Sequence, residues 1–447
     1  MVSSVLAILP LLAASWCCAL ATFSHAPPPR ADYSINRGWR FLQNATCRQC
    51  EEPTFDDAAW RVINVPHDFI HEGEFDPNAS MKGGYLAGGK GWYRREIISP
   101  PSFSALSSQL FLHFEAVMAN STVFLDGTRI AHHDSGYTPF RVDVTAAFAR
   151  SGGQPLVVLV CVDATAEATY GDSSDFWWYN GGGIYRNAWL TVMPQIGFIP
   201  FDGVYAPALV DADSIVLGAT PAGDTGAASL LPSIEIGNCN NGEVEVAVRV
   251  ESTLIDQRTG DVLGSVSSNH NVPFGERITV HHKLTVANVS LWSPDAPAIY
   301  THQALVRSLL DPQLAILDTL NTTIGFRHAR FDPELGFFLN RRATKIRGTA
   351  NHQDFAGVGV AVPDALQTFR VRALKAIGMN AWRTAHNAPT VALLEAADRE
   401  GMLVWDENHR NGQYDEAATL VLRDRNHASV IIWSICNEVC ICACIFL

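Results

Sequence analysis

Residues 429–435, Ser-Val-Ile-Ile-Trp-Ser-Ile, form an almost unbroken apolar run that is rich in β-branched side chains. Such a run is typical of a strand covered on both faces, as in a parallel sheet enclosed by helices. Asn437 and Glu438 follow it after a single residue, Cys436. In a (β/α)8 barrel the chemistry lies at the carboxyl ends of the strands, so this run predicts a barrel strand that delivers an amide and a carboxyl group to a functional site.

The residues before this run alternate between strand and helix patterns. This alternation predicts a parallel sheet whose strands are linked by helical crossovers. The other expected strands are residues 345–348, 380–385 and 403–407, and the expected helices are residues 363–377 and 390–400. Four strands are half of an eight-stranded barrel, so we assign residues 326–447 to a partial TIM barrel.

The N-terminal part shows short strand patterns separated by Gly, Pro and Asp, which predicts antiparallel sandwiches. We expect a jelly-roll β-sandwich over residues 27–195, with Asp126-Gly127 as a hairpin turn. We expect an immunoglobulin-like β-sandwich over residues 196–325, where helical periodicity is also absent. The expected strands are residues 91–98, 109–114, 121–125, 155–162, 188–193, 243–250, 278–286 and 301–307.

The composition is that of a folded protein, with 47% hydrophobic residues and a formal net charge of −13. No basic stripe is present to neutralise phosphates, which excludes a nucleic-acid partner. The expected ligand is a neutral small molecule or a glycan. The sequence does not predict an oligomeric state.

Residues 1–26 contain an apolar stretch, Val5 to Leu20, that is followed by small residues. This pattern predicts a secretory signal peptide, and hence a secreted or extracytoplasmic protein with no membrane partner. The alternative is a short membrane anchor, although about 20 unbroken apolar residues are normally needed to cross a bilayer. Asn-X-Ser/Thr glycosylation triplets, which fit an extracytoplasmic route, occur at Asn44, Asn78, Asn120, Asn288 and Asn321.

Two groups of cysteines remain after the predicted signal peptide is removed. Cys47 and Cys50 form an isolated C-x-x-C pair, for which a local disulfide, a metal half-site and no bond at all stay open. Cys440, Cys442 and Cys444 lie in the tail 439–447, which we interpret as foreign sequence.

Polar side chains follow each of the expected barrel strands. Glu438 lies beside an amide and near a large aromatic ring, which suits a general acid because partial desolvation raises the pKa of a carboxyl group. Arg383 and His386 lie at the carboxyl end of the second strand, where a guanidinium can orient a carboxylate through two donors, or form an ion pair with a neighbouring helix. Asp406 and Glu407 close the third strand, and we expect them to bridge to Arg383 or to help hold a cation.

Several motifs resemble glycoside hydrolase family 2, the group of β-galactosidases, β-glucuronidases and β-mannosidases. The run from Asp424 to Glu438 resembles the acid/base signature of that family, and Asn380 to Pro389 resembles its second-strand signature. Val65-Pro66-His67-Asp68 and the run from Gly183 to Leu190 resemble its jelly-roll domain. Leu291 to Tyr300 resembles the corner motif of its second domain.

This resemblance implies a retaining glycosidase of the β-galactosidase type that acts on a β-galactoside or a related glycan without a cofactor. It implies that Glu438 is the acid/base residue and that Asn437 donates to the sugar 2-hydroxyl. The implied substrate-binding residues are Asn437, His386, His352, Arg383 and Asp175. Asp354 would help to position His352, and the alternative is that both belong to a polar loop. We assign no metal, because Asn408-His409-Arg410-Asn411 does not keep the ligand spacing of the family.

A retaining glycosidase needs two carboxyl groups about 5–5.5 Å apart. In the family the nucleophile comes from a later barrel strand, so the resemblance implies that this chain lacks it and is inactive alone. Two alternatives are a non-catalytic module that binds glycans through the jelly roll, and a fragment with no function. Trp177 and Trp178 either stack on a sugar or pack in the sandwich core.

Overall fold

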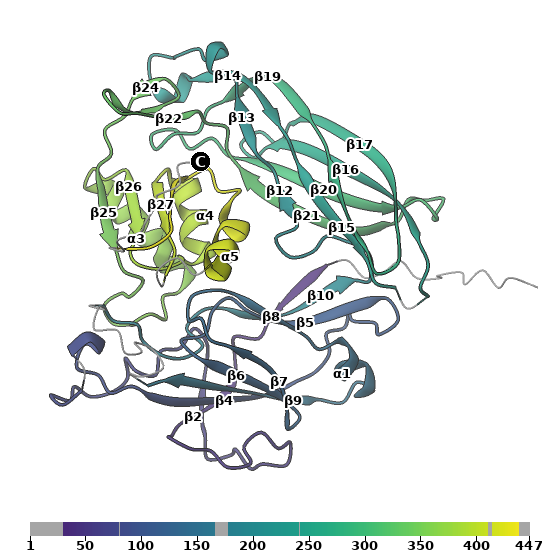
Figure 1. Cartoon of the computed structure of the whole chain (residues 1–447), viewed down its shortest axis with the longest axis vertical. Coiled ribbons are helices and arrows are strands. Elements are labelled where there is room, and N and C mark those ends of the chain that lie inside the picture. Colours follow the sequence, from purple (N-terminus) through teal and green to yellow (C-terminus); the bar gives the residue numbers. More distant parts are fainter. Residues whose placement is uncertain (1–29, 80, 166–177, 241, 410–413, 438–447) are drawn as a thin grey trace, which may run out of the picture.

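The computed structural model describes residues 30–79, 81–165, 178–240, 242–409 and 414–437. Two β-sandwiches and a smaller unit of alternating strands and helices make up the molecule (Figure 1). In this view the N-terminal sandwich lies below, the second sandwich lies at the upper right, and the strand-helix unit lies at the left. The predicted signal peptide lies outside the described residues.

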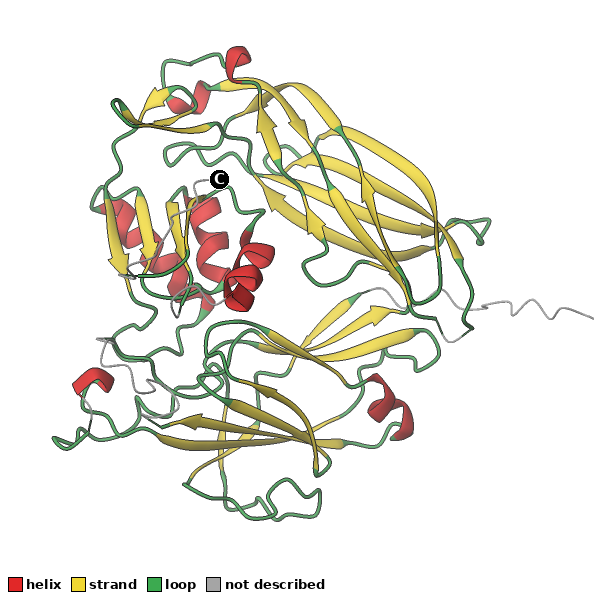
Figure 2. Ribbon diagram, viewed as in Figure 1, coloured by secondary structure: helices red, strands yellow, loops and turns green. Residues whose placement is uncertain are grey.

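The N-terminal sandwich is a jelly roll of antiparallel strands (Figure 2). One sheet has the order β3-β2-β4-β9-β6-β7, and the other has the order β1-β10-β5-β8. The strands are β1 (Ala31–Ser34), β2 (Trp39–Gln43), β3 (Arg61–Ile63), β4 (Gly89–Ile97), β5 (Ser108–Phe114), β6 (Ser121–Leu125), β7 (Thr128–His133), β8 (Phe140–Asp143), β9 (Leu156–Ala164) and β10 (Ala188–Pro194). A 3-10 turn, η1 (Met81–Gly83), and a short helix, α1 (Thr145–Arg150), complete the unit.

The alternation of side chains explains why these strands pair in this register. In β5 every second residue is buried, so Leu110, Leu112 and Phe114 enter the core while the residues between them face outward. Asp126 and Gly127 have φ values of 46° and 77°. Positive φ at both central residues is the requirement of a type I′ two-residue hairpin turn, so the predicted turn between β6 and β7 is confirmed.

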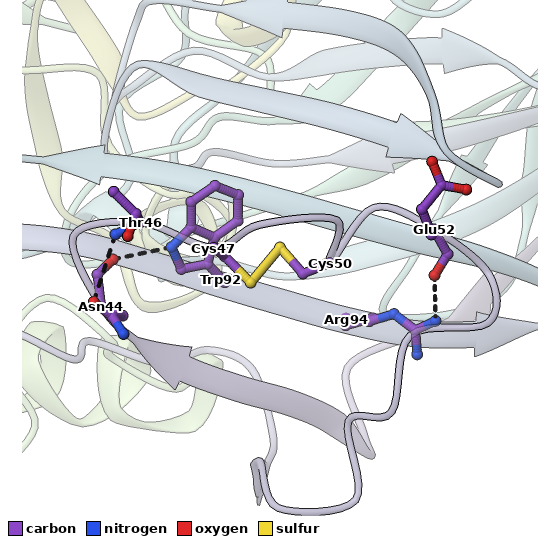
Figure 3. Close-up of a disulfide and its surroundings, with 7 residues drawn as sticks. All are labelled: Asn44, Thr46, Cys47, Cys50, Glu52, Trp92 and Arg94. Carbon is purple, nitrogen blue, oxygen red and sulfur yellow. Dashed lines mark hydrogen bonds between the residues drawn. A yellow bond between two sulfur atoms is a disulfide. The ribbon is translucent and has the colours of Figure 1, made fainter.

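Cys47 and Cys50 form a disulfide on the loop between β2 and β3 (Figure 3). Cys50 is fully buried beside Trp60 and Leu159. The backbone of this loop is held from both sides, because Trp92 Nε1 donates to Asn44 O (3.0 Å) and Arg94 donates to Glu52 O (3.0 Å). Of the alternatives open for this cysteine pair, the structure therefore contains the local disulfide.

The second sandwich is immunoglobulin-like and encloses a separate apolar core. Its longest sheet has the order β17-β16-β20-β21, and two smaller sheets have the orders β11-β15-β12, with β18 beside β15, and β13-β14-β19. The strands are β11 (Ile196–Phe198), β12 (Val204–Tyr205), β13 (Ala208–Val210), β14 (Thr225–Leu230), β15 (Ser233–Asn238), β16 (Val246–Asp256), β17 (Val262–Val272), β18 (Arg277–His281), β19 (Leu284–Ser290), β20 (Tyr300–Ser308) and β21 (Ile316–Ile324), with 3-10 turns η2 (Ala212–Ser214) and η3 (Pro221–Gly223).

One expected strand of this sandwich is wrong. Residues 278–286 form two strands, because β18 pairs with β15 whereas β19 pairs with β14. The chain passes from one sheet to the other at His282, whose ring points inward and bonds Ser252 Oγ (2.9 Å) and Ser268 Oγ (2.8 Å). An apolar pattern that continues across such a crossing cannot be told from a single strand.

The third unit is a partial TIM barrel. After a small sheet of β22 (Ala329–Asp332), β23 (Gly336–Leu339) and β24 (Arg342–Ala343), the chain alternates β25 (Gly348–Asn351), α3 (Asp364–Ala376), β26 (Ala381–Thr384), α4 (Val391–Glu400), β27 (Leu403–Glu407), α5 (Tyr414–Asp424) and β28 (Val430–Ser434). Strands β25 to β28 lie side by side in chain order, and all their pairings are parallel. The predicted barrel architecture is confirmed.

The first barrel strand was predicted over residues 345–348, whereas β25 begins at Gly348. The side chain of Asn380 explains the difference. It accepts from Arg347 N (2.7 Å) and donates to Lys345 O (2.9 Å), so it takes up backbone groups that a ladder would otherwise use.

The barrel packs against both sandwiches. Trp292, in the corner motif of the second sandwich, is fully buried and donates to Asp398 O of α4 (2.9 Å). Arg186 of the jelly roll is 2% exposed and donates to Ala388 O (2.7 Å) and Pro389 O (3.2 Å), at the loop after β26. Among the described residues, no helix has both the length and the apolarity that a membrane crossing requires.

Candidate active site

The carboxyl ends of β26, β27 and β28 bring together Arg383, Glu407 and Asn437. Arg383 Nε donates to Glu407 Oε2 (2.8 Å), and its terminal Nη2 donates to Glu407 Oε1 (3.0 Å). The same Nη2 donates to Asn437 Oδ1 (2.7 Å). These contacts depend on the parallel register, which sets residue 383 opposite residue 405 and so brings Glu407 to the end of the sheet.

Glu407 is the centre of this cluster and has no exposed surface. It also contacts His386 Nδ1 (2.7 Å) and accepts from Ser434 Oγ (3.2 Å). Burial acts to raise the pKa of Glu407, but the hydrogen bonds from His386 and Arg383 and their charges outweigh it and hold the pKa below its ordinary value. Glu407 is therefore an anchored anion that orients Arg383 and His386.

The predicted bridge from the third strand to Arg383 is thus made by Glu407. Asp406, the residue before it, contacts other groups. Asp406 is fully buried beside α5. Its burial, and then the nearby charge of Asp424, raise the pKa of Asp406 well above its ordinary value. Asp406 therefore lies beside the charged end of α5, and it does not belong to the cluster around Glu407.

Aromatic rings form a second side of the site. Trp178, from the jelly roll, lies parallel to His352, with ring centroids 5.7 Å apart and an interplanar angle of 17°. The centroid of His386 is 4.9 Å from that of Trp178, and that of His409 is 6.2 Å away. Burial, and then the charge of His386, lower the pKa of His352, so this ring is neutral at neutral pH. Asp354 acts on it in the opposite direction through its charge.

Of the predicted site residues, the structure brings together Arg383, His386, Asn437 and His352. The predicted acid/base residue Glu438 and the predicted substrate residue Asp175 lie outside the described residues, as does Trp177. Three contributions were not predicted: the contact of Glu407 with His386, the support from Ser434, and the contacts of Trp178 and His409. Within the part of the chain that the structure describes, no group of three or more His, Cys, Asp or Glu side chains is arranged to hold a metal ion.

Two sandwiches that lead into a TIM barrel, with arginine, histidine, amide and carboxylate groups at the carboxyl ends of its strands, are the architecture of the modular glycosidases. Family models agree with this class. Residues 83–194 match "Glycosyl hydrolases family 2, sugar binding domain", residues 220–327 match "Glycosyl hydrolases family 2", and residues 334–414 and 409–445 match "Glycosyl hydrolases family 2, TIM barrel domain". The chain belongs to glycoside hydrolase family 2. Because the barrel match runs to residue 445, our interpretation of the tail as foreign sequence is wrong up to that residue.

Individual relatives match most of this chain. Beta-galactosidase BoGH2A of Bacteroides ovatus is 32% identical over 92% of this chain and 47% of its own length. A beta-glucuronidase of Formosa agariphila is 25% identical over 90% of this chain and 42% of its own length. The crystal structure of a beta-glycosidase from Bacteroides vulgatus matches 92% of this chain and 51% of that one, with a TM-score of 0.77 and 27% identity. The chain spans about half the length of the curated relatives it matches.

Proposed function

We propose that the whole protein is a retaining glycosidase that acts on terminal β-galactosides, with Glu438 as the acid/base residue. The observation that carries the proposal is the hydrogen bond from Arg383 to Asn437 Oδ1. Because the amide oxygen is occupied, the Asn437 Nδ2 group is left to donate to a sugar hydroxyl. The beta-galactosidase from Bacteroides ovatus, at 32% identity, supports a galactoside ahead of a glucuronide.

Retention requires a second carboxylate opposite the acid, about 5–5.5 Å from it. Glu407 is a poor nucleophile, because both of its oxygens accept hydrogen bonds and its side chain is fully buried. Asp406 is fully buried beside α5, and its burial raises its pKa well above the ordinary value. No described carboxylate at the strand ends therefore suits the role of nucleophile, and we expect residues 1–447 alone to bind without turnover.

The test compares residues 1–447 with the whole protein, using aryl β-galactosides and aryl β-glucuronides. We expect the whole protein to release the aryl group from the galactoside, and proton NMR to show retention of the anomeric configuration. Inversion, or faster release from the glucuronide, would refute the proposal. Turnover by residues 1–447 that disappears in Glu438→Ala would show that the nucleophile has been overlooked.

Glu438→Gln in the whole protein tests the acid. The change removes the proton donor and preserves shape, so substrates with poor leaving groups should lose about 10²–10⁴-fold in rate. An activated aryl galactoside should lose much less. Equal losses would mean that Glu438 is not the acid. If glycan binding persists in a protein that never hydrolyses a glycoside, the jelly roll is a binding module instead.

We also infer that the protein is secreted and that residues 1–26 are its signal peptide. The Cys47–Cys50 disulfide supports this inference, since such bonds persist in oxidising compartments. Asn44 and Asn321 carry glycosylation triplets and are exposed. N-terminal sequencing of protein from the culture medium should start after Ala21 or Ala26; an intact Met1 would contradict the inference.

A further inference from the structure

Asp68 joins three segments that are far apart in the sequence. It lies in the jelly-roll loop between β3 and β4 and is 4% exposed. Its carboxylate accepts five hydrogen bonds, from Ile70 N (3.2 Å), His71 N (3.3 Å), Gly182 N (3.0 Å), Tyr179 Oη (2.8 Å) and Val360 N (2.9 Å). A buried carboxylate with this many donors has no free lone pair to offer a ligand, so its role is to hold the segments that bind it.

The two carboxylate oxygens have different partners. Oδ1 accepts the three backbone N–H groups of the jelly roll. Oδ2 accepts the hydroxyl of Tyr179 and the backbone N–H of Val360, which lies in the barrel loop between β25 and α3. Oδ1 thus shapes the jelly roll, whereas Oδ2 links the jelly roll to the mouth of the barrel.

Both partners of Oδ2 adjoin a ring of the candidate site. Tyr179 directly follows Trp178, and Val360 lies in the loop that begins with His352. These are the two rings that stack in parallel at 5.7 Å. One oxygen atom therefore fixes the segments of both members of the stack.

Glycines leave room for this arrangement. A Cβ atom on Gly359 would collide with Asp68 Oδ2, and a Cβ atom on Gly181 would collide with both Asp68 and Val360. The backbones of the jelly roll and of the barrel loop approach the carboxylate so closely that only glycine fits at these two positions.

We propose that Asp68 is a positioning residue of the glycosidase site, which acts by holding Trp178 of the jelly roll against His352 of the barrel. An effect of Asp68 on catalysis rests on the proposed function, because it presupposes that the site hydrolyses a glycoside. The proposal assigns to the first domain a part in building the site. Asp68 also helps to position His386, because the His386 ring contacts both Trp178 and His352.

Asp68→Asn separates the two roles of the carboxylate. An amide can keep its oxygen at Oδ1 and so preserve the three jelly-roll bonds, while its NH₂ group at the Oδ2 position faces the N–H of Val360 and cannot accept from it. Tyr179→Phe is a milder variant that removes only the hydroxyl bond. Asp224→Asn is the matched control: Asp224 is 1% exposed and links the second sandwich to Arg342 beside the barrel (2.6 and 2.7 Å), far from this stack in sequence.

The first readout is the titration of His352 in residues 1–447, followed by NMR of the imidazole and assigned with His352→Gln. Burial, to which the contact with Trp178 contributes, lowers the pKa of His352 from the ordinary value of 6.5. Asp68→Asn should raise this pKa toward 6.5, and Tyr179→Phe should raise it less. Asp224→Asn should leave the pKa of His352 unchanged, even if this variant lowers the melting temperature as much as Asp68→Asn does. The proposal would be overturned if the pKa of His352 were unchanged in both Asp68→Asn and Tyr179→Phe. It would also be overturned if Asp224→Asn shifted this pKa as much as Asp68→Asn does.

The second readout is kinetic and uses the whole protein. Asp68→Asn should lower kcat/KM for an aryl β-galactoside by about 100-fold, since small misplacements of positioning groups cost rates on this scale. Asp224→Asn should leave kcat/KM unchanged. If the whole protein hydrolyses no glycoside, the proposed function fails, while the titration of His352 still decides whether Asp68 holds the stack.

Discussion

Glu407 shows how one buried charge organises a site at the scale of residues. Its carboxylate accepts two hydrogen bonds from the Arg383 guanidinium and contacts His386 Nδ1. Arg383→Ala would leave this carboxylate buried without its guanidinium. We expect a loss of about 3 kcal/mol in the free energy of unfolding. This value is at the lower end of the usual range for breaking a buried ion pair, because the Arg383 side chain is 28% exposed.

Urea unfolding of residues 1–447 measures this loss, with Arg330→Ala as the control. Arg330 pairs with Asp332 at the surface, where its side chain is 48% exposed, so its removal should change stability by no more than about 0.5 kcal/mol. Similar losses in both variants would mean that the Arg383–Glu407 pair is no stronger than a surface pair.

The residue scale also shows what the sequence could reveal. Arg383, His386 and Asn437 were predicted to meet because each lies at or just after the carboxyl end of a strand whose pattern is visible in the sequence. The sequence could not tell that Glu407 would enter the site while its neighbour Asp406 would face α5. Successive side chains point to opposite faces of a sheet, and which face is which depends on the register with β26 and β28.

At the scale of elements, His427 ties the turn before β28 to α4. Its Nδ1 atom lies 2.6 Å from Asp398 Oδ2, and Asp398 Oδ1 accepts from Ser429 N (2.8 Å). Burial acts to lower the pKa of His427, but the charge and hydrogen bond of Asp398 outweigh it, so the pKa lies above 6.5. The pair therefore stabilises the fold fully below the unfolded pKa, and this contribution is lost as pH rises through the folded pKa.

His427→Gln should accordingly destabilise the protein near pH 6, and the gap from the unaltered protein should narrow by about pH 9. Free energies of unfolding across this range measure the gap. A gap that is constant with pH would show that His427 contributes packing and not charge.

Gly401 ends α4 in the left-handed region, with φ of 75°. An added Cβ atom would also collide with Pro294 O of the second sandwich. Gly401→Ala should therefore cost about 2–4 kcal/mol, the sum of the backbone penalty and the overlap. Gly260→Ala is the control, since Gly260 has φ of 79° but nothing within 4 Å of a Cβ atom. Equal losses by urea unfolding would show that the overlap is relieved at no cost.

The elements differ in how well the sequence predicted them. Strand β27 was predicted over its full length, and α3 and α4 to within a residue at each end. In α4 the ends are marked by Thr390, which caps the first turn, and by Gly401, which is left-handed. Helix α5 was missed, although Asp415 and Glu416 in its first turn and Arg423 in its last turn suit a helix dipole. Strand β25 was misplaced because the side chain of Asn380 takes up backbone groups before it. The crossing at His282 was missed because the apolar pattern continues from β18 into β19.

At the scale of the whole molecule, Arg186 couples the jelly roll to the barrel. Its guanidinium donates to Ala388 O, Pro389 O, Tyr137 O and Gln353 Oε1. Arg186→Met should leave these buried carbonyl groups without their donor and weaken the junction by several hydrogen bonds of about 1 kcal/mol each. We expect calorimetry to show the jelly roll unfolding at a lower temperature than the rest. A single transition that shifts as a whole would contradict this expectation.

The Cys47–Cys50 bond closes a loop of only four residues. In the chain-entropy view, the stabilisation from so short a loop is about 2 kcal/mol, and the three largest apolar clusters of the described residues contain neither cysteine. Although such a bond points to an oxidising compartment, the chain should not need an oxidising compartment in order to fold. The chain should therefore reach the same fold when it is produced in a reducing cytosol, with both cysteines as thiols.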